Sequence, residues 1–165
     1  MENNNRTINE VTSCAPALNY YRLAKLTMVE GTNQVRNCVL NHLPSCQSFH
    51  TTLQRKQNSL RQLYKNRIIS EKQWRLLYPE HKNADVTGID LTLWIVLLRN
   101  ITRLNSRNIN WNDAPGPEQT EWYHDVLRIR ETRNNLSHLM RPELDSESFD
   151  TLWNEMITAL RRLNE

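Results

Sequence analysis

The stretch from Leu91 to Ile101, LTLWIVLLRNI, constrains the fold more than any other part of the sequence. Its apolar residues occupy nearly every side of a helical cylinder, and Arg99 brings in the only charge. A helix that is apolar on most sides is typical of the centre of a bundle. Asp90 directly precedes the stretch and suits a helix N-cap, because its carboxylate can accept from exposed backbone N–H groups. We therefore expect a buried central helix here.

Further helices are predicted where apolar residues recur at spacings of three and four. They cover residues 17–43, 49–66, 70–78, 117–140 and 146–163, and Ser70 with Gln73 has the spacing of a capping box. Gly31 is expected to divide the first of them. The chain holds only three glycines and no strand pattern longer than four residues, which favours an all-α bundle. We expect a flexible tail over residues 1–15 and a single helical domain over residues 16–165.

An arginine falls in the predicted buried seam of the helix over residues 117–140. At helical spacing, this seam holds Val126, Ile129, Leu136 and Met140, and Arg133 lies in the same series. Burying a guanidinium is costly unless the group is paired or faces a cavity. Candidate partners in the sequence are Glu131, Asp125 and Asp90. Arg133 is therefore expected to pair with an acid, reach solvent or line a cleft.

Arg133, Asn134 and His138 form the candidate catalytic set. Asn134 and His138 are four residues apart and share one helix face. His138 lies about 140° around the helix from Arg133, at about 100° per residue. The two side chains cannot both point at one small group from a single straight helix. This geometry predicts a cleft at a helix end, or a site shared by two copies of the chain.

This set suits metal-independent cleavage of RNA by its own 2′-hydroxyl. That reaction needs a base, an acid for the leaving 5′ oxygen, and cations for the charge on phosphorus. A histidine such as His138 can serve as acid or base, Arg133 can bind phosphate oxygens in a fork, and Asn134 can orient either group. Arg128 and Arg130 would add affinity for phosphate. However, the spacing alone is common, and a structural role at a helix C-terminus is also physically adequate. Both interpretations stay open.

A second series, formed by Cys38, His42, Cys46 and His50, repeats every four residues. On an unbroken helix it would line one face, but Pro44 interrupts the run. Structural zinc sites usually gather their ligands from two separate elements. We therefore expect two small buried thiols and two surface imidazoles, with neither a metal nor a cofactor.

Net charge, the N-terminal sequence and the cysteine count bear on the expected partners and compartment. The net charge of +3 is mildly basic and does not by itself indicate a nucleic-acid partner. The N-terminal sequence MENNNRTINE has no apolar core, and no apolar run approaches the length of a membrane span. Three cysteines, an odd number, fit a reducing compartment. We expect an intracellular, cytoplasmic protein with no membrane partner.

Five blocks of sequence occur in a specific order: QWRLLYP, GIDLTLWIVLLRNITRL, INWNDAPGP, DVLRIRETRNNLSH and FDTLWNEMITALRRL. In this order they resemble the HEPN (higher eukaryotes and prokaryotes nucleotide-binding) domain. The resemblance is to the type found in the DAZ-interacting zinc-finger ubiquitin ligase and in invertebrate multidomain proteins. It covers about residues 17–163, nearly the whole chain.

The resemblance implies a bundle of about five helices that pairs as a homodimer through the motif-bearing helix. Members of the wider class include metal-independent endoribonucleases. Their signature of Arg, a polar residue and a later His matches Arg133, Asn134 and His138. Other members lack the motif and act as interaction or RNA-binding modules, often fused to signalling or innate-immunity domains. Trp94, Glu131 and Thr132 depart from the expected pattern, which leaves the RNA specificity open.

Two functions follow as hypotheses. The first is an RNA-binding domain and candidate metal-independent endoribonuclease, with Arg133, Asn134 and His138 in a composite site at a dimer interface. The second is a catalytically silent dimerisation module that couples the sensing of RNA, a nucleotide or another ligand to an attached signalling or ubiquitin-ligase effector. Fold alone does not decide between them.

Overall fold

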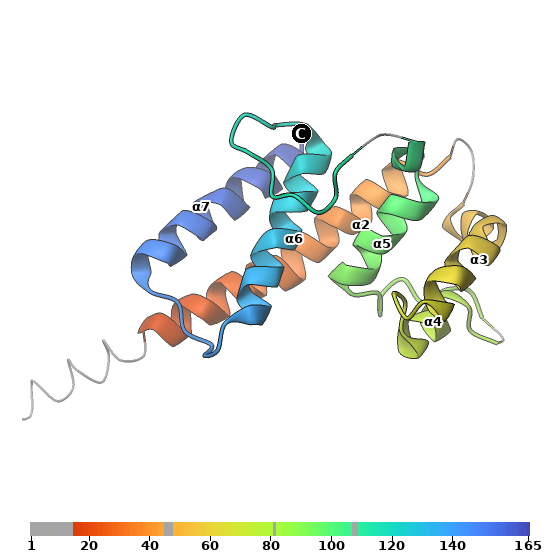
Figure 1. Ribbon diagram of the computed structural model, residues 1–165, viewed down its shortest axis with the longest axis horizontal. Helices are drawn as coiled ribbons and strands as arrows, with labels where there is room; N and C mark the ends of the chain where they lie inside the picture. The colour runs from red at the N-terminus through yellow and green to blue at the C-terminus, as the bar shows by residue number, and fades with distance from the viewer. Residues whose placement is uncertain (1–14, 45–47, 81, 107–108) are drawn as a thin grey trace, which may run out of the picture. The chain divides into compact units, whose positions relative to one another are not determined.

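The computed structural model describes residues 15–44, 48–80, 82–106 and 109–165, and all regular structure within these ranges is helical (Figure 1). Residues 15–25 form an α-helix, which continues into the π-helix η1. The remaining elements are a 3-10 helix, η2, and six α-helices. Their bounds are η1 Leu26–Gly31, α2 Thr32–Asn41, α3 Phe49–Lys65, α4 Glu71–Leu77, α5 Leu91–Ile101, η2 Arg103–Ser106, α6 Trp122–His138 and α7 Ser146–Leu163. The predicted all-α fold is confirmed. The tail predicted over residues 1–15 lies almost wholly outside the described residues.

Short polar side chains set the starts of several helices. The hydroxyl of Ser70 accepts from the Gln73 backbone, and the Gln73 side chain accepts from the Ser70 backbone, so the predicted capping box is present. Asp90 Oδ1 accepts from the Leu93 backbone N at 2.8 Å, which confirms Asp90 as an N-cap. Asp145 caps α7 in the same way, and its bonds with Ser148 lower the pKa of the carboxyl.

The described residues form two compact units. The first contains residues 15–31 together with residues 114–165, and the second contains residues 32–113. The chain crosses between the units within a continuous helical run, directly after Gly31. A division of contacts does not decide whether the units fold separately, so the single domain over residues 16–165 stays a prediction.

In the second unit, α5 packs against α2, α3 and η2. Leu93, Trp94, Leu97 and Leu98 of α5 are completely buried. The ring of Phe49, at the start of α3, lies 5.5 Å from that of Trp94, centroid to centroid. Helix α5 is therefore the centre of this unit, as its apolar sequence predicted.

In the first unit, α6 and α7 lie side by side, and η1 packs against both of them (Figure 1). The core between them includes Leu23, Val126, Ile129 and Met156, all completely buried. Gly31 does not divide the helical run, so that prediction was wrong. Its role is close packing, because a Cβ atom at this position would lie 2.9 Å from Cγ2 of Ile129.

Candidate functional site

The loop before α6 is tied to the helix by one arginine. Nη2 of Arg128 donates to the Gly116 carbonyl at 2.6 Å and to the Gln119 carbonyl at 2.8 Å. Within the loop, the Gln119 backbone N also donates to the Gly116 carbonyl at 3.1 Å. These bonds hold residues 116–119 in a turn, so α6 begins at Trp122 and not at Pro117 as predicted.

The buried seam of α6 differs from the predicted one. Its buried side chains are Asp125, Val126, Leu127, Ile129, Thr132 and Leu136. Thr132 occupies the inward position, whereas Arg133 is only partly buried. Met140, which was predicted to be buried, lies beyond the end of the helix at His138 and is fully exposed. The helix therefore avoids the cost of burying the Arg133 guanidinium at the centre of its seam.

The buried acid of this seam is Asp125, and two arginines share its carboxylate. Arg128 Nη1 donates to Oδ1 at 3.0 Å. Arg162, from α7, donates from Nε to Oδ2 at 2.9 Å and from Nη2 to Oδ1 at 2.6 Å. These bonds to Asp125 raise the pKa of the Arg162 guanidinium. The expectation that Asp125 could pair with Arg133 was wrong, because Arg128 and Arg162 bind this carboxylate and Arg133 donates to Asn134 instead.

The three motif residues lie in the last two turns of α6. Arg133 Nη1 donates to Asn134 Oδ1 at 3.0 Å, so these two side chains contact each other. His138 is the last residue of the helix and is exposed. Within the described part of the chain, no hydrogen bond joins His138 to Arg133 or Asn134. One copy of the chain therefore holds an Arg–Asn pair and a separate imidazole at the helix end.

Exposed apolar residues follow the motif directly. Leu139 adopts an extended conformation, with φ −63° and ψ 130°, and ends α6. Its side chain is 40% exposed, and Met140 is fully exposed. Arg141, the next residue, is also exposed and was not singled out from the sequence. The end of α6 thus presents an imidazole, two apolar side chains and a cation on one short segment.

The two arginines that were expected to bind substrate are mostly covered by protein. The Arg128 side chain is 13% exposed, and that of Arg130 is 18% exposed. Arg128 is engaged by Asp125 and by the loop carbonyls, as described above. Arg130 Nη2 lies 3.8 Å from Glu131 Oε2. A structural position is therefore established for Arg128, and Arg130 presents only a small part of its side chain to solvent.

His124, in the first turn of α6, is a further titratable group that the sequence analysis did not single out. Its Nδ1 atom is buried and has no hydrogen-bond partner in the described residues. Burial of the ring, together with the positive charge of Arg128, lowers the pKa of His124. Glu121 and Asp125 oppose this shift. The imidazole is therefore held toward its neutral form.

The Cys38 to His50 series does not lie on one helix. Helix α2 ends at Asn41, and α3 begins at Phe49. Cys38 is buried, as predicted, and Nδ1 of His42 lies 2.8 Å from the Cys38 carbonyl. Cys46 lies outside the described residues. Within the ranges that the structure describes, no three His, Cys, Asp or Glu side chains gather as metal ligands.

None of the described helices is both long enough and apolar enough to span a membrane.

Comparison with known families places most of the chain. The family model described as DZIP3/hRUL138-like HEPN matches residues 46–165, which is well over half of the chain and includes all of α6 and α7. No curated protein and no solved structure gave a significant match. The match agrees with the resemblance carried by the five sequence blocks and with the all-helical structure. The chain belongs to the DZIP3/hRUL138-like HEPN family.

Proposed function

We propose that this chain is an RNA-binding HEPN domain that cleaves RNA without a metal, through a composite site formed by two copies of α6. The proposal is supported by one observation above the others. Arg133, Asn134 and His138 are all present at the end of α6, with Arg133 bonded to Asn134 and His138 exposed. The family match gives this arrangement its context, since the spacing of the three residues carries little weight alone.

The three side chains have distinct roles in the proposed reaction. The 2′-hydroxyl of the RNA attacks the adjacent phosphorus, and the 5′ oxygen of the next nucleotide leaves. His138 would take the proton from the attacking hydroxyl or give one to the leaving oxygen. Arg133 would stabilise the negative charge that develops on the phosphoryl oxygens. Asn134, through its bond with Arg133, would hold the guanidinium in place. The products would carry a 2′,3′-cyclic phosphate and a 5′-hydroxyl.

A second copy of the chain would complete the site. Arg133 and His138 are separated by about 140° around one helix, so a single α6 cannot aim both at one phosphate. A reaction that uses both a base and an acid also benefits from two imidazoles. Leu139 and Met140 supply exposed apolar surface beside His138, which a partner's helix end could cover. We propose a homodimer through this end of α6.

Phosphate affinity is assigned to the cations nearest the motif. We propose Arg130 and the exposed Arg141 as additional phosphate contacts beside Arg133. We propose a structural role for Arg128, because its N–H groups donate to Asp125, Gly116 and Gln119. A phosphate contact by Arg128 would require breaking bonds that hold the loop before α6.

The test is cleavage of end-labelled single-stranded RNA in the presence of EDTA. Wild type is compared with His138→Gln, Arg133→Gln and a control, His50→Gln, which removes an exposed imidazole from α3. We expect wild type and the control to cut and the two motif variants to lose about 100-fold or more of the rate. Cleavage that continues in His138→Gln, or products that end in a 3′-hydroxyl, would refute the mechanism.

Dimerisation is tested separately with Met140→Glu, beside Val29→Glu as a control at an exposed apolar position of η1. A negative charge at a covered apolar contact destabilises the interface, so Met140→Glu is expected to shift the mass in solution toward one chain. If cleavage requires the dimer, the same variant loses activity in step with its loss of pairing. An active Met140→Glu monomer would argue for a site within one chain.

The alternative is a catalytically silent adaptor that dimerises and binds RNA or another ligand. The contacts that two arginines make within the protein favour this alternative. Arg133 is bonded to Asn134, and Arg128 belongs to a buried cluster. On this proposal His138 and Arg133 stabilise the helix end and the dimer contact. The adaptor would be supported if the wild-type chain binds RNA and forms a dimer but does not cleave RNA. Loss of the dimer in His138→Gln would support it further.

A further inference from the structure

We propose that the second unit carries a binding surface for single-stranded RNA where α3 turns into α4. This surface, which we call the basic corner, consists of Lys65, Arg67, Lys72 and Arg75 together with the ring of Tyr64. It belongs wholly to residues 32–113 and includes no residue of the α6 motif. The inference rests on the proposed function only in taking RNA as the ligand, and it does not depend on cleavage.

Positive charge is concentrated in the sequence that forms this corner. Against one acid, Glu71, residues 55–75 hold seven cations: Arg55, Lys56, Arg61, Lys65, Arg67, Lys72 and Arg75. Seven cations less one acid give this segment a net charge of +6, whereas the whole chain carries +3, so the rest of the chain is net negative. All seven except the half-buried Lys56 are exposed. Basic residues clustered on one segment are typical of a surface that binds nucleic acid.

The turn after α3 holds an arginine at a position that favours glycine. Arg67 has a φ of 60°, in the left-handed region, and it directly follows Asn66, the C-cap of α3. Its backbone N donates to the Tyr64 carbonyl at 3.0 Å, and the Ile68 N donates to the Leu63 carbonyl at 2.9 Å. These two bonds form a Schellman motif, in which the left-handed residue is usually glycine because a Cβ atom is unfavourable there.

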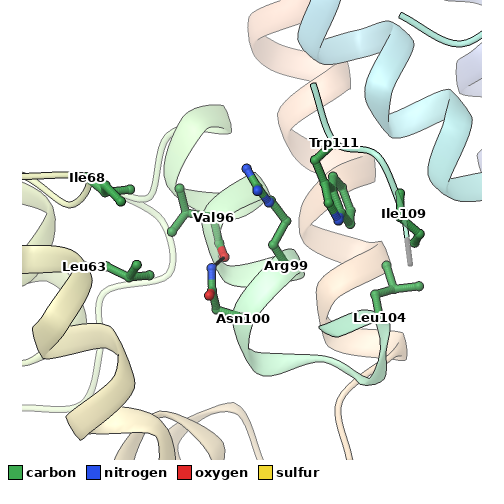
Figure 2. A pocket seen from close by; sticks show the side chains of 8 residues that line it. All are labelled: Leu63, Ile68, Val96, Arg99, Asn100, Leu104, Ile109 and Trp111. Atoms are coloured by element: carbon green, nitrogen blue, oxygen red, sulfur yellow. Dashed lines mark hydrogen bonds between the residues drawn. The ribbon is translucent and has the colours of Figure 1, made fainter. Parts of the chain in front are cut away.

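The apolar contact of this turn is made by residues other than Arg67. Figure 2 shows Leu63 and Ile68 on the side of the turn that faces Val96 of α5, and the three side chains line one cavity. Arg67 is instead exposed and lines a different hollow, beside Tyr64. An exposed cation that is kept in a strained backbone conformation favours a role in binding over a role in packing.

Two hollows that are open to solvent adjoin at the basic corner. The first has a volume of about 510 Å³ and is lined by Tyr64, Lys65, Arg67, Ile69, Ser70 and Glu71. The second has a volume of about 480 Å³ and is lined by Glu71, Lys72, Arg75 and Leu76. Glu71 borders both hollows, and its carboxylate is bonded to Arg75.

The other three cations of the corner are available to phosphate. Among the residues that the structure describes, no hydrogen bond or ion pair engages the side chain of Lys65, Arg67 or Lys72. Arginine and lysine both bind phosphate oxygens, and each contact displaces a counterion from the nucleic acid. A phosphate backbone that follows the two hollows would therefore meet cations in both of them.

An aromatic ring borders these cations and favours single-stranded RNA. The Tyr64 ring stacks on that of Trp74 from α4, with centroids 5.2 Å apart and an angle of 22° between the planes. Trp74 in turn lies 4.3 Å from the ring of Tyr78, so Tyr64 is held in place while it lines the first hollow. Fixed aromatic rings beside cations are typical of sites that bind unpaired bases, which a duplex does not offer.

The test measures binding by fluorescence anisotropy in EDTA at several salt concentrations. The probe is a fluorescein-labelled oligouridine of about 12 nucleotides with methylated 2′ oxygens, so it lacks the attacking hydroxyl and stays uncut. The full chain is compared with Arg67→Gly and with the double variant Lys65→Gln with Lys72→Gln. The matched control is Lys25→Gln with Lys82→Gln, which removes two exposed lysines outside both hollows.

We expect the double variant at Lys65 and Lys72 to weaken binding about tenfold or more at low salt. It should also lower the slope of log affinity against log salt by about 1.4, because each lost phosphate contact removes about 0.7. Arg67→Gly should lower the slope by about 0.7, yet its urea midpoint should equal or exceed that of wild type, since glycine suits the left-handed position. The control should bind within about twofold of wild type.

Equal binding by the double variant and the control would overturn the inference, although RNA binding by the chain would stand. If wild type does not bind the probe, both the basic corner and the proposed RNA function fail. A loss of stability in Arg67→Gly with unchanged affinity would show that Arg67 serves the fold, which contradicts its place in the binding surface. Absence of RNA cleavage would leave the inference standing, because the methylated probe reports binding alone.

A second arm distinguishes RNA from an acidic membrane surface. Ile68 is 54% exposed beside Arg67, and apolar groups among cations also suit anionic lipid. Vesicles of phosphatidylserine and phosphatidylcholine are therefore sedimented with the same variants. If vesicle binding is lost in the double variant while probe binding is unchanged, the surface binds lipid and the inference is wrong. Tighter binding of a methylated duplex of the same length would likewise contradict the choice of single-stranded RNA.

Discussion

Arg162 binds both oxygens of Asp125 from a position 37 residues later in the chain. Nε donates to Oδ2 at 2.9 Å and Nη2 to Oδ1 at 2.6 Å, and Asp125 is completely buried. Arg128 joins the same carboxylate from one turn along α6. The end of α7 therefore fixes the start of α6, and α6 carries the candidate site at its opposite end.

Replacing Asp125 should be among the most damaging single changes in the first unit. Asp125→Ala leaves two arginines without their shared acid and breaks the link between α6 and α7. Breaking a buried ion pair by removing one partner costs about 3–5 kcal/mol, so we expect a loss of that size in the free energy of unfolding. Urea denaturation followed by circular dichroism measures it. Arg161→Met, at the exposed neighbour of Arg162, is the control and should change stability by less than about 0.5 kcal/mol.

Stability should fall as the pH is lowered through the range in which histidine titrates. The pKa of His124 is lower in the folded chain than in the unfolded chain, mainly because the ring is buried. Its contribution is therefore complete above about pH 6.5 and is lost as the pH falls through the lower folded pKa. We expect His124→Gln to flatten the dependence of unfolding free energy on pH between about 5.0 and 7.5. If the slope of unfolding free energy against pH is the same in His124→Gln as in wild type, His124 does not cause the pH dependence.

The carboxylates of Asp85 and Asp145 do not interfere with that measurement. Hydrogen bonds with Thr87 and with Ser148, respectively, lower their pKa values. Their contributions are present above the ordinary carboxyl range and disappear only at more acidic pH. The window from about pH 5.0 to 7.5 is therefore dominated by histidines.

Gly31→Ala should destabilise the first unit although alanine is the better helix former. The added Cβ would lie 2.9 Å from Cγ2 of Ile129, a branched methyl that cannot swing aside without moving the side chain. Overpacking typically costs about 1–3 kcal/mol, against a gain in helix propensity of about 1 kcal/mol. We expect a net loss of about 1 kcal/mol in a urea titration. Gly116→Ala is the control, because a Cβ there meets nothing closer than 4.0 Å. A stabilised Gly31→Ala protein would contradict the close packing.

Arg130 and Arg128 should respond differently to the same substitution. If Arg130 contacts phosphate, Arg130→Gln should lower the slope of log affinity for single-stranded RNA against log salt by about 0.7. Arg128→Gln should instead reduce the free energy of unfolding, because it removes the bonds to Asp125, Gly116 and Gln119. Binding titrations at four salt concentrations, alongside urea denaturation, separate the two effects. If the slope of log RNA affinity against log salt changes in Arg128→Gln and not in Arg130→Gln, then Arg128 and not Arg130 contacts phosphate.

Local signals in the sequence predicted much of the helical structure. Ser70 with Gln73 predicted a capping box, Asp90 predicted an N-cap, and the apolar run after it predicted a buried helix, because each depends on neighbours within a few residues. The same holds for α7, whose bounds at Ser146 and Leu163 match the prediction. The motif of Arg133, Asn134 and His138 was also visible as a local pattern.

Relationships between distant residues were not visible in the same way. Asp125 lies at the right spacing to face the seam of α6, but nothing near it in the sequence points to Arg162 as its partner. The start of α6 was misplaced because it depends on bonds from Arg128 to carbonyls nine and twelve residues earlier. Gly31 was taken for a helix breaker because the need for space next to Ile129 arises only from packing.

The position of Arg162 also bears on how this protein can be shortened or fused. It lies in the last turn of α7, and Asn164, two residues later, is the C-cap of this helix. A fragment ending at residue 160 would keep most of α7 and most of its helical circular dichroism. It would nevertheless lose the guanidinium that binds both oxygens of Asp125. An RNA-binding assay on that fragment would therefore measure a protein in which the start of α6 is no longer held by α7. A reporter or affinity tag is better joined after Glu165, where the linker leaves Arg162 and the cap intact.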